Sequence, residues 1–346
     1  MKKTTLERRM ELKRIKKFIT AALLATFVLS ATACTMIEKT PEAIAKSAVA
    51  KVNGVKITKA ELDANPSTVQ LIATMKSYYG DNYTTNETAM SYFKTQKTSI
   101  LNQMVTEELV LQKAKELNIG QDETEVQKEV DVKYAGIKGG YKSDEEFTTA
   151  LTSSGFDDTS FKAYLKEQII IEKVTTDISK DVTVTDQAVQ DYYDANPYNY
   201  TESPNTIHTA HILVATEDEA KAVKARLDAG EDFAAVAKEK STDTASSANG
   251  GDLGTVKYVD SGFDATFMAA AIALKVGEVS APVKTSFGYH IIKCIEKTEY
   301  PLKAFATVKD EVKKTVLDTA KSTAVTNKIA EWTKAADIKT YTDNIM

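Results

Sequence analysis

Histidine is the residue type best suited to holding or moving a proton near neutral pH, because its unperturbed pKa is about 6.5. The chain has three histidines, His208, His211 and His290, and all of them lie within residues 207–296. His211 and His290 each stand inside an apolar run, where a single histidine is most often a hydrogen-bonded core residue. His208 is out of register with His211 along the same run, so we expect it on the surface.

Metal and phosphate chemistry are not indicated by the other motifs. Cys34, Cys294 and the histidines lack metal-ligand spacing, so we expect no metal, and Cys294 is expected to be a small buried apolar residue. The run Gly250–Gly254 lacks the G-x-G-x-x-G spacing and the βαβ context of a phosphate loop. Its glycines instead predict a tight turn into a strand, in which Asp252 makes a stabilising Asx hydrogen bond.

Apolar periodicity predicts the elements that hold these residues. Strands are expected at 207–214, 253–258, 279–283 and 289–296, and helices at 217–230, 233–240 and 263–274. The first helix has a capping box formed by Thr216 and Glu219. The order β-α-α-β-α-β-β predicts an α+β unit, a small antiparallel sheet with covering helices.

This stretch resembles a parvulin-type peptidyl-prolyl isomerase domain over about 90 residues. The shared motifs, in family order, are His211-Ile-Leu, Ser241-Thr-Asp, Gly250-Gly-Asp-Leu-Gly, Phe267, Val276-Gly-Glu, Pro282-Val and Gly288-Tyr-His-Ile-Ile-Lys. The resemblance implies isomerisation of X-Pro bonds without a cofactor. Amide resonance sets a barrier of ~18–20 kcal/mol, and an apolar pocket favours the twisted, less charge-separated transition state. No covalent nucleophile is needed.

The same resemblance implies the catalytic residues. His211 and His290 match the facing histidine pair of the two central strands. Asp243 matches the acidic or thiol position near the substrate carbonyl. The loop 241–249 is one residue longer than the common pattern, so Thr244 is an alternative to Asp243.

Substrate contacts also follow from the resemblance. Phe267 matches the aromatic residue that packs on the proline ring, and Phe263 stands where the family commonly has methionine. A phenylalanine there forms an apolar wall or narrows the pocket. Leu253 and Phe287 are the other predicted substrate-binding residues.

The first 34 residues have the pattern of a lipoprotein signal. Residues 1–17 are basic, and the sixteen uncharged residues 18–33 are shorter than a membrane span of ~20 residues. The small residues 31–33 before Cys34 resemble a lipobox, although Ala31 replaces a larger aliphatic residue. We therefore predict a signal peptide at 1–33, lipidation of Cys34 and a tether at 34–47. The alternative is an ordinary signal peptide with a coincidental cysteine.

The segments on either side of the parvulin-like unit are predicted to be mostly helical. A hairpin at 48–59 turns at Asn53-Gly54, and Thr58 caps the next helix. Further helices are expected at 86–118, 123–134, 143–151 (with a Ser143/Glu146 capping box), 158–178 and 186–193. Methionine and tyrosine residues between 75 and 92 line either a client cradle or, more simply, the core.

The tail, 299–346, has an apolar stripe from Phe305 to Trp332 and a strand-like end near 336–341 that is expected beside Val49–Val52. A long helix needs a partner, and the helical segment before residue 203 supplies one. We therefore predict that residues 204–298 are a domain inserted between the N-terminal (48–203) and C-terminal (299–346) parts of one helical chaperone domain, with a boundary loop at 196–204.

The whole chain resembles the PrsA-type foldase lipoproteins of Gram-positive bacteria, with weaker flanking motifs Val52-Asn-Gly, Ile57-Thr and Val182-Thr-Val-Thr-Asp. This implies a foldase anchored on the extracytoplasmic face of the cell membrane. Its partners would be unfolded secreted proteins with X-Pro bonds, and a homodimer is left open. The alternatives are a non-catalytic holdase with a degenerate parvulin domain and a solute-binding lipoprotein, although the latter should show long βα repeats.

Residues 1–33 carry eight basic and two acidic residues, so residues 34–346 carry 36 basic against 47 acidic ones. This acidic body argues against nucleic acid.

Overall fold

The computed structural model describes residues 40–346. The predicted signal peptide and the predicted lipidation site, Cys34, lie outside the described residues. The described end of the predicted tether contains a short helix, α2 (Pro41–Ala45), which Thr40 caps. It belongs to a unit separate from residues 48–346. None of the helices within residues 40–346 is long and apolar enough to span a membrane.

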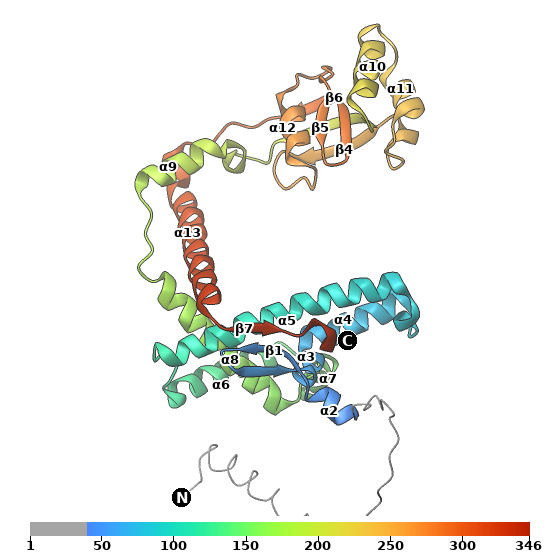
Figure 1. Cartoon of the computed structure of the whole chain (residues 1–346). Helices are drawn as coiled ribbons and strands as arrows, with labels where there is room; N and C mark the ends of the chain where they lie inside the picture. Colours follow the sequence, from blue (N-terminus) through green and yellow to red (C-terminus); the bar gives the residue numbers. More distant parts are fainter. Residues whose placement is uncertain (1–39) are drawn as a thin grey trace, which may run out of the picture. The chain divides into compact units, whose positions relative to one another are not determined.

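A three-stranded antiparallel sheet joins the two ends of the second unit. Strands β1 (Ala48–Val52) and β2 (Val55–Thr58) form the predicted hairpin, in which Asn53 and Gly54 take left-handed backbone conformations. Strand β7 (Ile338–Thr340) pairs antiparallel with β1, giving the order β2-β1-β7. The predictions of the hairpin and of the C-terminal strand beside it are both confirmed (Figure 1).

Most of this part is helical. Its helices are α3 (Lys59–Ala64), α4 (Pro66–Tyr79), α5 (Glu87–Glu116), α6 (Glu123–Lys138), α7 (Asp144–Ser153), α8 (Asp158–Ser179), α9 (Asp186–Ala195) and α13 (Phe305–Ala335), with 3-10 turns η1 (Tyr83–Thr85), η2 (Pro197–Tyr200) and η4 (Thr342–Asn344). The predicted capping box of α7 is only half formed. Ser143 accepts from the Glu146 amide, but the Glu146 carboxylate accepts from the Lys142 amide instead of that of Ser143.

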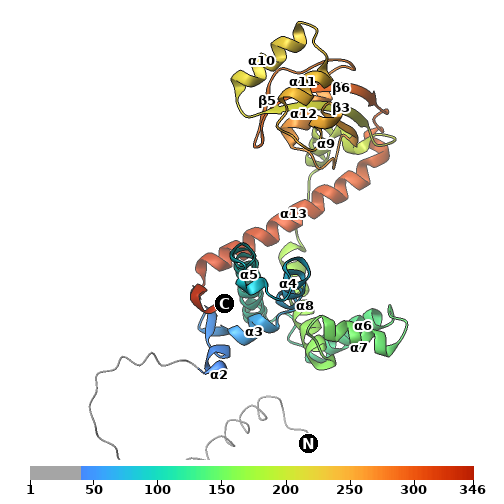
Figure 2. The ribbon, with the colours of Figure 1, turned by 90° about the vertical axis from the view of Figure 1, so that its right-hand side faces the viewer.

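The C-terminal helix α13 packs on helices from before residue 203, as predicted. Near its start, Val308 and Val312 share an apolar cluster with Val189 and Tyr193 of α9. Near its end, Trp332 joins the core formed by β1, α5 and α8. Figure 2 shows α13 running past α5 and α8. Because α13 closes two apolar cores that the N-terminal segment leaves open, the two segments form one discontinuous domain.

The inserted unit has the predicted element order. It contains β3 (Thr206–Val214), α10 (Glu217–Asp228), α11 (Phe233–Lys240), the turn η3 (Ser247–Asn249), β4 (Asp252–Lys257), α12 (Ala265–Ala273), β5 (Val283–Thr285) and β6 (Gly288–Thr298). The four strands form an antiparallel sheet in the order β4-β3-β6-β5. The predicted fold class, a small antiparallel sheet with covering helices inserted into a mostly helical domain, is confirmed.

Two predicted elements of this unit were placed wrongly. The strand expected at 279–283 begins only at Val283, and Val279 makes a single bridge to Lys293. The helix expected from Phe263 begins at Ala265, because the Asp264 side chain accepts from the amides of Thr266 and Phe267 and so caps it. Phe263 therefore lies in the loop before α12.

The sheet has an apolar cluster on each face. Ala210, Ile212 and Val214 of β3 pack with α10 and α11 on one face. Ile292 and Cys294 of β6 pack with α12 on the other, and Cys294 is fully buried, as predicted. Side chains alternate between the faces of a strand, so His211 and His290 are directed to the α12 face. The covering helices can be followed in Figures 1 and 2.

Candidate active site

A pair of buried histidines lies at the centre of the four-stranded sheet. The Nδ1 atoms of His211 and His290 are 3.0 Å apart, and the rings are stacked at an angle of 29° with centroids 5.2 Å apart. The pairing register explains this contact, because His211 is opposite Ile292 and His290 is opposite Leu213. The two histidines are therefore diagonal neighbours on adjacent strands, within reach of one another.

The hydrogen-bond network continues from His211 to the loop after α11. The Asp243 Oδ2 atom is 2.8 Å from His211 Nε2, and it also accepts from the Ser246 hydroxyl at 2.5 Å. The Asp243 side chain is 22% exposed while that of His211 is 8% exposed, so the carboxylate is the end of the network that solvent reaches. Thr244 is exposed and makes none of these contacts. Of the two alternatives from the sequence, the structure brings Asp243 to the histidines.

Electrostatics keep Asp243 ionised. Burial opposes ionisation, but the hydrogen bonds from Ser246, His211 and the Ala245 amide outweigh it and lower the pKa of the carboxyl group. The carboxylate can therefore only accept hydrogen bonds at neutral pH, and His211 donates to it through Nε2.

On its other side the network ends at Thr285, which the sequence did not single out. Its Oγ1 atom is 2.8 Å from His290 Nε2 and accepts from the Phe287 amide at 3.1 Å. Thr285 pairs with Gly288 across the β5–β6 turn, which brings its side chain back toward His290. A hydroxyl five residues before a strand histidine is too common a pattern to have identified it. Ser246 was missed for the same reason.

These contacts fix the direction of every proton when both imidazoles are neutral. His211 donates to Asp243 through Nε2, so its Nδ1 is an acceptor and must receive the proton of His290 Nδ1. His290 Nε2 is then an acceptor for the Thr285 hydroxyl. Burial and the neighbouring His211 lower the pKa of His290 to about 4, so it is neutral at pH 7. His290 is therefore a fixed, neutral part of the polar floor that the two histidines form.

An aromatic wall stands beside the histidines. The Phe267 ring of α12 contacts both imidazoles edge to face, at 5.8 Å from His211 and 5.3 Å from His290. Phe263 is stacked on Phe267 at 5.5 Å with an angle of 21° between the rings. Phe267 is only 2% exposed, whereas Phe263 is part-exposed. The ring that the wall presents to solvent is therefore Phe263.

The other predicted substrate-binding residues are placed differently from one another. Leu253 is partly buried against the apolar cluster that holds Phe267. Phe287 is 73% exposed at the β5–β6 turn, with its amide bonded to Thr285. Leu253 is thus part of the same apolar body as the wall, and Phe287 projects from the turn that carries the end of the network.

The glycine run positions the backbone of His211. His211 donates its amide to the Gly251 carbonyl at 2.8 Å, and a Cβ atom at Gly251 would lie 2.1 Å from the His211 carbonyl oxygen. The Gly254 amide donates to Asp252 Oδ1, so the predicted Asx turn is present. The run is therefore a close-packed turn at the strand that holds His211.

His208 was expected on the surface, and it lies there only in part, with 25% of its side chain exposed. Its Nε2 atom is 2.8 Å from Asp252 Oδ1, and its side chain is part-buried. The pairing of β3 with β4 and with β6 shifts register next to His208. The bonds from His208 and the Gly254 amide lower the pKa of Asp252. His208 therefore helps to fasten the glycine turn and makes no contact with the histidine pair.

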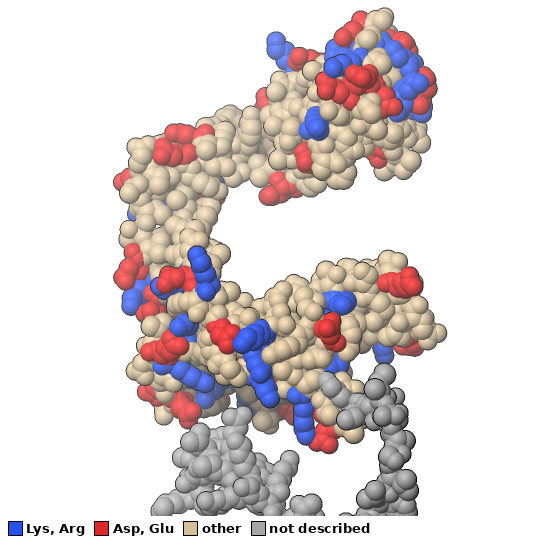
Figure 3. Space-filling view, in the orientation of Figure 1, with Lys and Arg blue, Asp and Glu red and all other residues tan. Residues whose placement is uncertain are grey.

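The surface of the same unit carries mutually neutralising charges. Figure 3 shows side chains of both signs gathered over α10 and α11. Arg226, for example, lies 2.7 Å from both Glu231 and Glu239. These helices cover the sheet face opposite the histidine pair, and the charges that act on the pKa of His290 are instead those of His211, Asp264 and Asp243.

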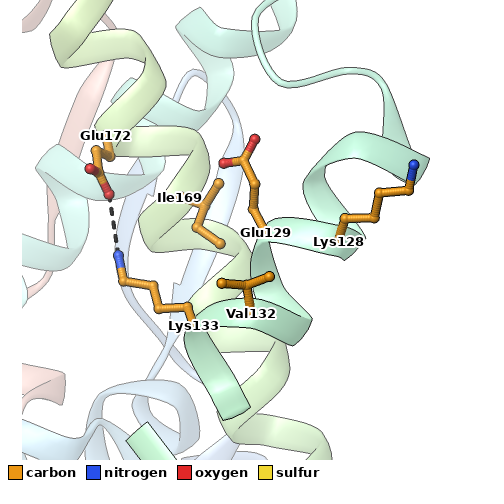
Figure 4. Close-up of a pocket in the computed structure, with 6 residues that line it drawn as sticks. All are labelled: Lys128, Glu129, Val132, Lys133, Ile169 and Glu172. Carbon is orange, nitrogen blue, oxygen red and sulfur yellow. Dashed lines mark hydrogen bonds and ion pairs between the residues drawn. The ribbon is translucent and has the colours of Figure 1, made fainter. Parts of the chain in front are cut away.

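A hollow of about 400 Å³ between α6 and α8 contains none of the network residues (Figure 4). Figure 4 shows Lys133 beside Ile169 and bonded to Glu172, at 3.2 Å. Its charged lining is largely committed to ion pairs, since Glu129 also binds Lys173 at 2.7 Å. We assign it no chemistry. Within residues 40–346, no group of three or more His, Cys, Asp or Glu side chains is arranged to hold a metal ion.

The methionine and tyrosine residues between 75 and 92 divide into buried and exposed ones. Met75 and Tyr83 are buried in a small core with Phe93. Tyr78, Tyr79 and Tyr92 are exposed, Tyr78 most of all. Three aromatic side chains near the tip of the α4–α5 pair are therefore exposed.

The sheet order, the histidine pair on its two central strands and the aromatic wall of α12 define a parvulin-type peptidyl-prolyl isomerase domain. Residues 203–296 match the family model of the PPIC-type PPIASE domain, and residues 7–175 match that of the SurA-like N-terminal domain. The chain belongs to the PrsA foldase family.

Curated relatives show this membership along the full length. The chain is 54% identical over 341 residues to Foldase protein PrsA of Clostridium kluyveri, a match that covers 97% of this chain and 100% of the relative. It is 50% identical over 336 residues to Foldase protein PrsA of Clostridium botulinum, with the same coverage. A solved structure of the PrsA peptidylprolyl isomerase of Bacillus anthracis is 28% identical, with a TM-score of 0.41, and the match covers 67% of this chain and 96% of that one.

Proposed function

We propose that this protein is a foldase that assists the folding of secreted proteins and that its domain 204–298 isomerises X-Pro bonds. The observation that carries the proposal is the closed network from Thr285 through the two histidines to Asp243, set against the Phe263–Phe267 wall. This arrangement offers an apolar surface for a proline ring and a fixed polar floor, and it contains no activated nucleophile. Rotation about an amide bond needs no more than this.

We assign the catalytic roles to His211, His290 and Asp243. A planar amide has negative charge on its oxygen through resonance, and the twisted transition state has less. An ionised Asp243 near the substrate carbonyl raises the energy of the planar state more than that of the twisted state, which lowers the barrier. The hydrogen-bonded histidine pair holds Asp243 in position, and the apolar wall excludes water from the rotating bond.

The test is the isomerisation rate of an Ala-Pro-containing peptide, measured by NMR exchange. Wild-type protein should accelerate exchange well above the rate of the double variant His211→Ala, Asp243→Ala. Equal rates for the two proteins would remove the catalytic half of the proposal. A conservative control is Asp243→Glu, which keeps the charge and should retain part of the activity.

A holdase without turnover is the second candidate, and one observation favours it. Phe263 covers the face of Phe267, the ring expected to pack on proline, and leaves it almost no exposure. If Phe263 does not move, catalysis is blunted, and the exposed tyrosines of the helical domain carry the function. This candidate predicts suppression of client aggregation that is unchanged in the same double variant.

We further propose anchoring on the extracytoplasmic membrane face through a lipid on Cys34, after removal of residues 1–33. The sequence pattern before Cys34 supports it. Mass spectrometry of the mature N-terminus should find a diacylglyceryl cysteine, and Cys34→Ser should release the protein from the membrane fraction.

The domain limits proposed from the sequence are 34–47, 48–203, 204–298 and 299–346. Light scattering of the purified chain tests for a homodimer.

A further inference from the structure

A second groove begins at Phe263, on the side of the loop before α12. It has a volume of about 710 Å³ and lies between the α9–η2 segment and residues 258–268. That volume is within the range of ~300–1,000 Å³ typical of ligand pockets. Among its lining residues are Asp194, Tyr198, Tyr258, Asp260, Phe263 and Met268.

The groove is continuous with the candidate active site through one side chain. Phe263 lines the groove and is also stacked on Phe267, which contacts both histidines. An extended peptide advances ~3.3–3.6 Å per residue. A client whose proline lies against Phe263 therefore brings residues one to three positions away into reach of the groove.

The walls of the groove are largely aromatic and apolar. Tyr198 packs edge to face on Tyr258, with ring centroids 5.1 Å apart, and this contact joins η2 to the end of β4. Phe263 and Met268 add further apolar surface. Such walls suit a long aliphatic stem or a guanidinium plane that stacks on an aromatic face.

The charges of the groove are negative. Its lining includes the carboxylates of Asp194 and Asp260 and no lysine or arginine. Asp194 accepts one bond, from Gln190. Asp260 has no hydrogen-bond or ion-pair partner among residues 40–346, and its backbone is left-handed, with φ of 55°. Asp260 also lines the adjoining hollow together with Lys257 and Lys303, but neither lysine forms an ion pair with it.

An unpaired carboxylate held on a strained backbone beside aromatic walls is complementary to a cationic side chain with an apolar stem. We propose that this groove is a subsite for a lysine or arginine of the client, placed one to three residues from the proline, and that it gives the isomerase a preference for such sequences. This inference rests on the proposed isomerase function. A partly exposed ion pair is worth a factor of about two to five in affinity.

The test uses sets of X-Pro peptides. Within each set the peptides are identical except at one position, which carries Lys, Ala, Leu or Glu. The sets place that position at each site from three residues before the proline to three residues after it. We expect kcat/KM of the full chain to be about two- to fivefold higher for Lys than for Ala at one of these positions, and lower for Glu. Asp260→Asn and Asp194→Asn should each reduce the Lys/Ala ratio, and the double variant should bring it to about one. The kcat/KM for the Ala peptide should stay unchanged in all of them, which also shows that the variants fold.

The matched control is Asp218→Asn, which removes one exposed, unpaired carboxylate of the same domain outside the groove. It should leave the Lys/Ala ratio as in wild type. The proposal is overturned if the ratio is the same in wild type and in the double variant, or if Leu is preferred to Lys, which would make the occupant apolar.

Failure of the isomerase proposal is distinguishable from failure of this one. If wild-type protein isomerises no peptide faster than the His211→Ala, Asp243→Ala variant does, the subsite is still tested by peptide binding. Lys peptides should then shift the NMR signals of the 259–263 amides more strongly than Ala peptides do, and the double Asn variant should abolish that difference. Equal shifts for the two peptides would overturn the subsite.

Discussion

The proton positions in the histidine pair are set by its outermost partners. Asp243 can only accept a hydrogen bond, so His211 must donate through Nε2. The Nδ1 of His211 then accepts from His290, and the Nε2 of His290 accepts from the Thr285 hydroxyl. A buried network is worth most when every member is satisfied, because an unpaired polar atom in a low dielectric is costly. Thr285 is therefore as much a part of the site as the two histidines.

Replacing Thr285 tests that claim. Thr285→Val keeps the shape of the side chain but leaves the buried His290 Nε2 without a donor, which costs about 1–3 kcal/mol. We expect kcat/KM to fall about tenfold and to be largely restored in Thr285→Ser, which returns the hydroxyl. As a positioning residue, Thr285 should also affect the tautomer, so the ¹⁵N shifts of His290 should change in the Val variant and not in the Ser variant. If Val and Ser variants behave alike, the hydroxyl has no such role.

The lowered pKa of His290 predicts a loss of stability in acid. The folded-state pKa is about 4 and the unfolded one about 6.5. Below the unfolded value only the unfolded chain takes up the proton, so stability falls as the pH drops from about 6.5 toward about 4. At pH 4.5 this group should have reduced the unfolding free energy by about 2–3 kcal/mol relative to pH 7.

Urea unfolding at both pH values measures this effect. Carboxyl groups also titrate in this range, so the comparison is between wild type and His290→Gln, which lacks the titrating ring. The pH-dependent loss should be smaller in the variant. An equal loss in both proteins would show that His290 is not the source.

Among the secondary-structure elements, the glycine turn before β4 shows how a loop fixes a catalytic strand. Gly251→Ala should destabilise the chain by more than about 3 kcal/mol, because the new Cβ atom would meet the His211 carbonyl oxygen at 2.1 Å and φ is +81°. Gly262→Ala is the matched control, since its φ is +77° but no atom lies within 4 Å of the added Cβ. It should cost only the backbone strain, about 1–2 kcal/mol. Similar costs by urea unfolding would mean that the close approach is unimportant.

Sequence patterns predicted the elements that have strong local signals. The Thr58 cap, the Thr216 capping box, the Asn53-Gly54 hairpin and the apolar stripe of α13 all depend on residues near in sequence, and each is present. The misplaced elements depend on distant partners. Val279 and Ser280 look like a strand but contact β6 by isolated bonds, and the register shift at His208 arises from pairing with two neighbouring strands.

The family motifs predicted most residues of the candidate site. The other residues were identified only from the three-dimensional structure. His211, His290, Asp243 and Phe267 stand in recognisable motifs. Thr285, Ser246 and the burial of Phe267 under Phe263 depend on how turns fold back onto the sheet, and no short pattern encodes this. The groove at Asp260 was missed for the same reason, because α9 and β4 are far apart in sequence.

At the scale of the whole molecule, the two domains have separate apolar cores, so a core substitution in one domain should leave the other folded. Trp332 belongs to the helical core that joins the N- and C-terminal segments, and Val236 belongs to the cluster under α10 and α11. Trp332→Ala should destabilise the helical domain by about 3–5 kcal/mol, and Val236→Ala should destabilise the parvulin domain by about 2–3 kcal/mol.

Differential scanning calorimetry of the full chain, together with isomerase activity and client aggregation at rising temperature, separates the two effects. In Trp332→Ala, suppression of client aggregation should be lost at a lower temperature than in wild type, while isomerisation of a short peptide persists. In Val236→Ala, isomerisation should be lost at a lower temperature, while suppression of aggregation persists. Residues 196–205 and 299–304 link the inserted domain to α9 and α13. A joint loss of both activities in either variant would show instead that the two domains unfold as one cooperative unit.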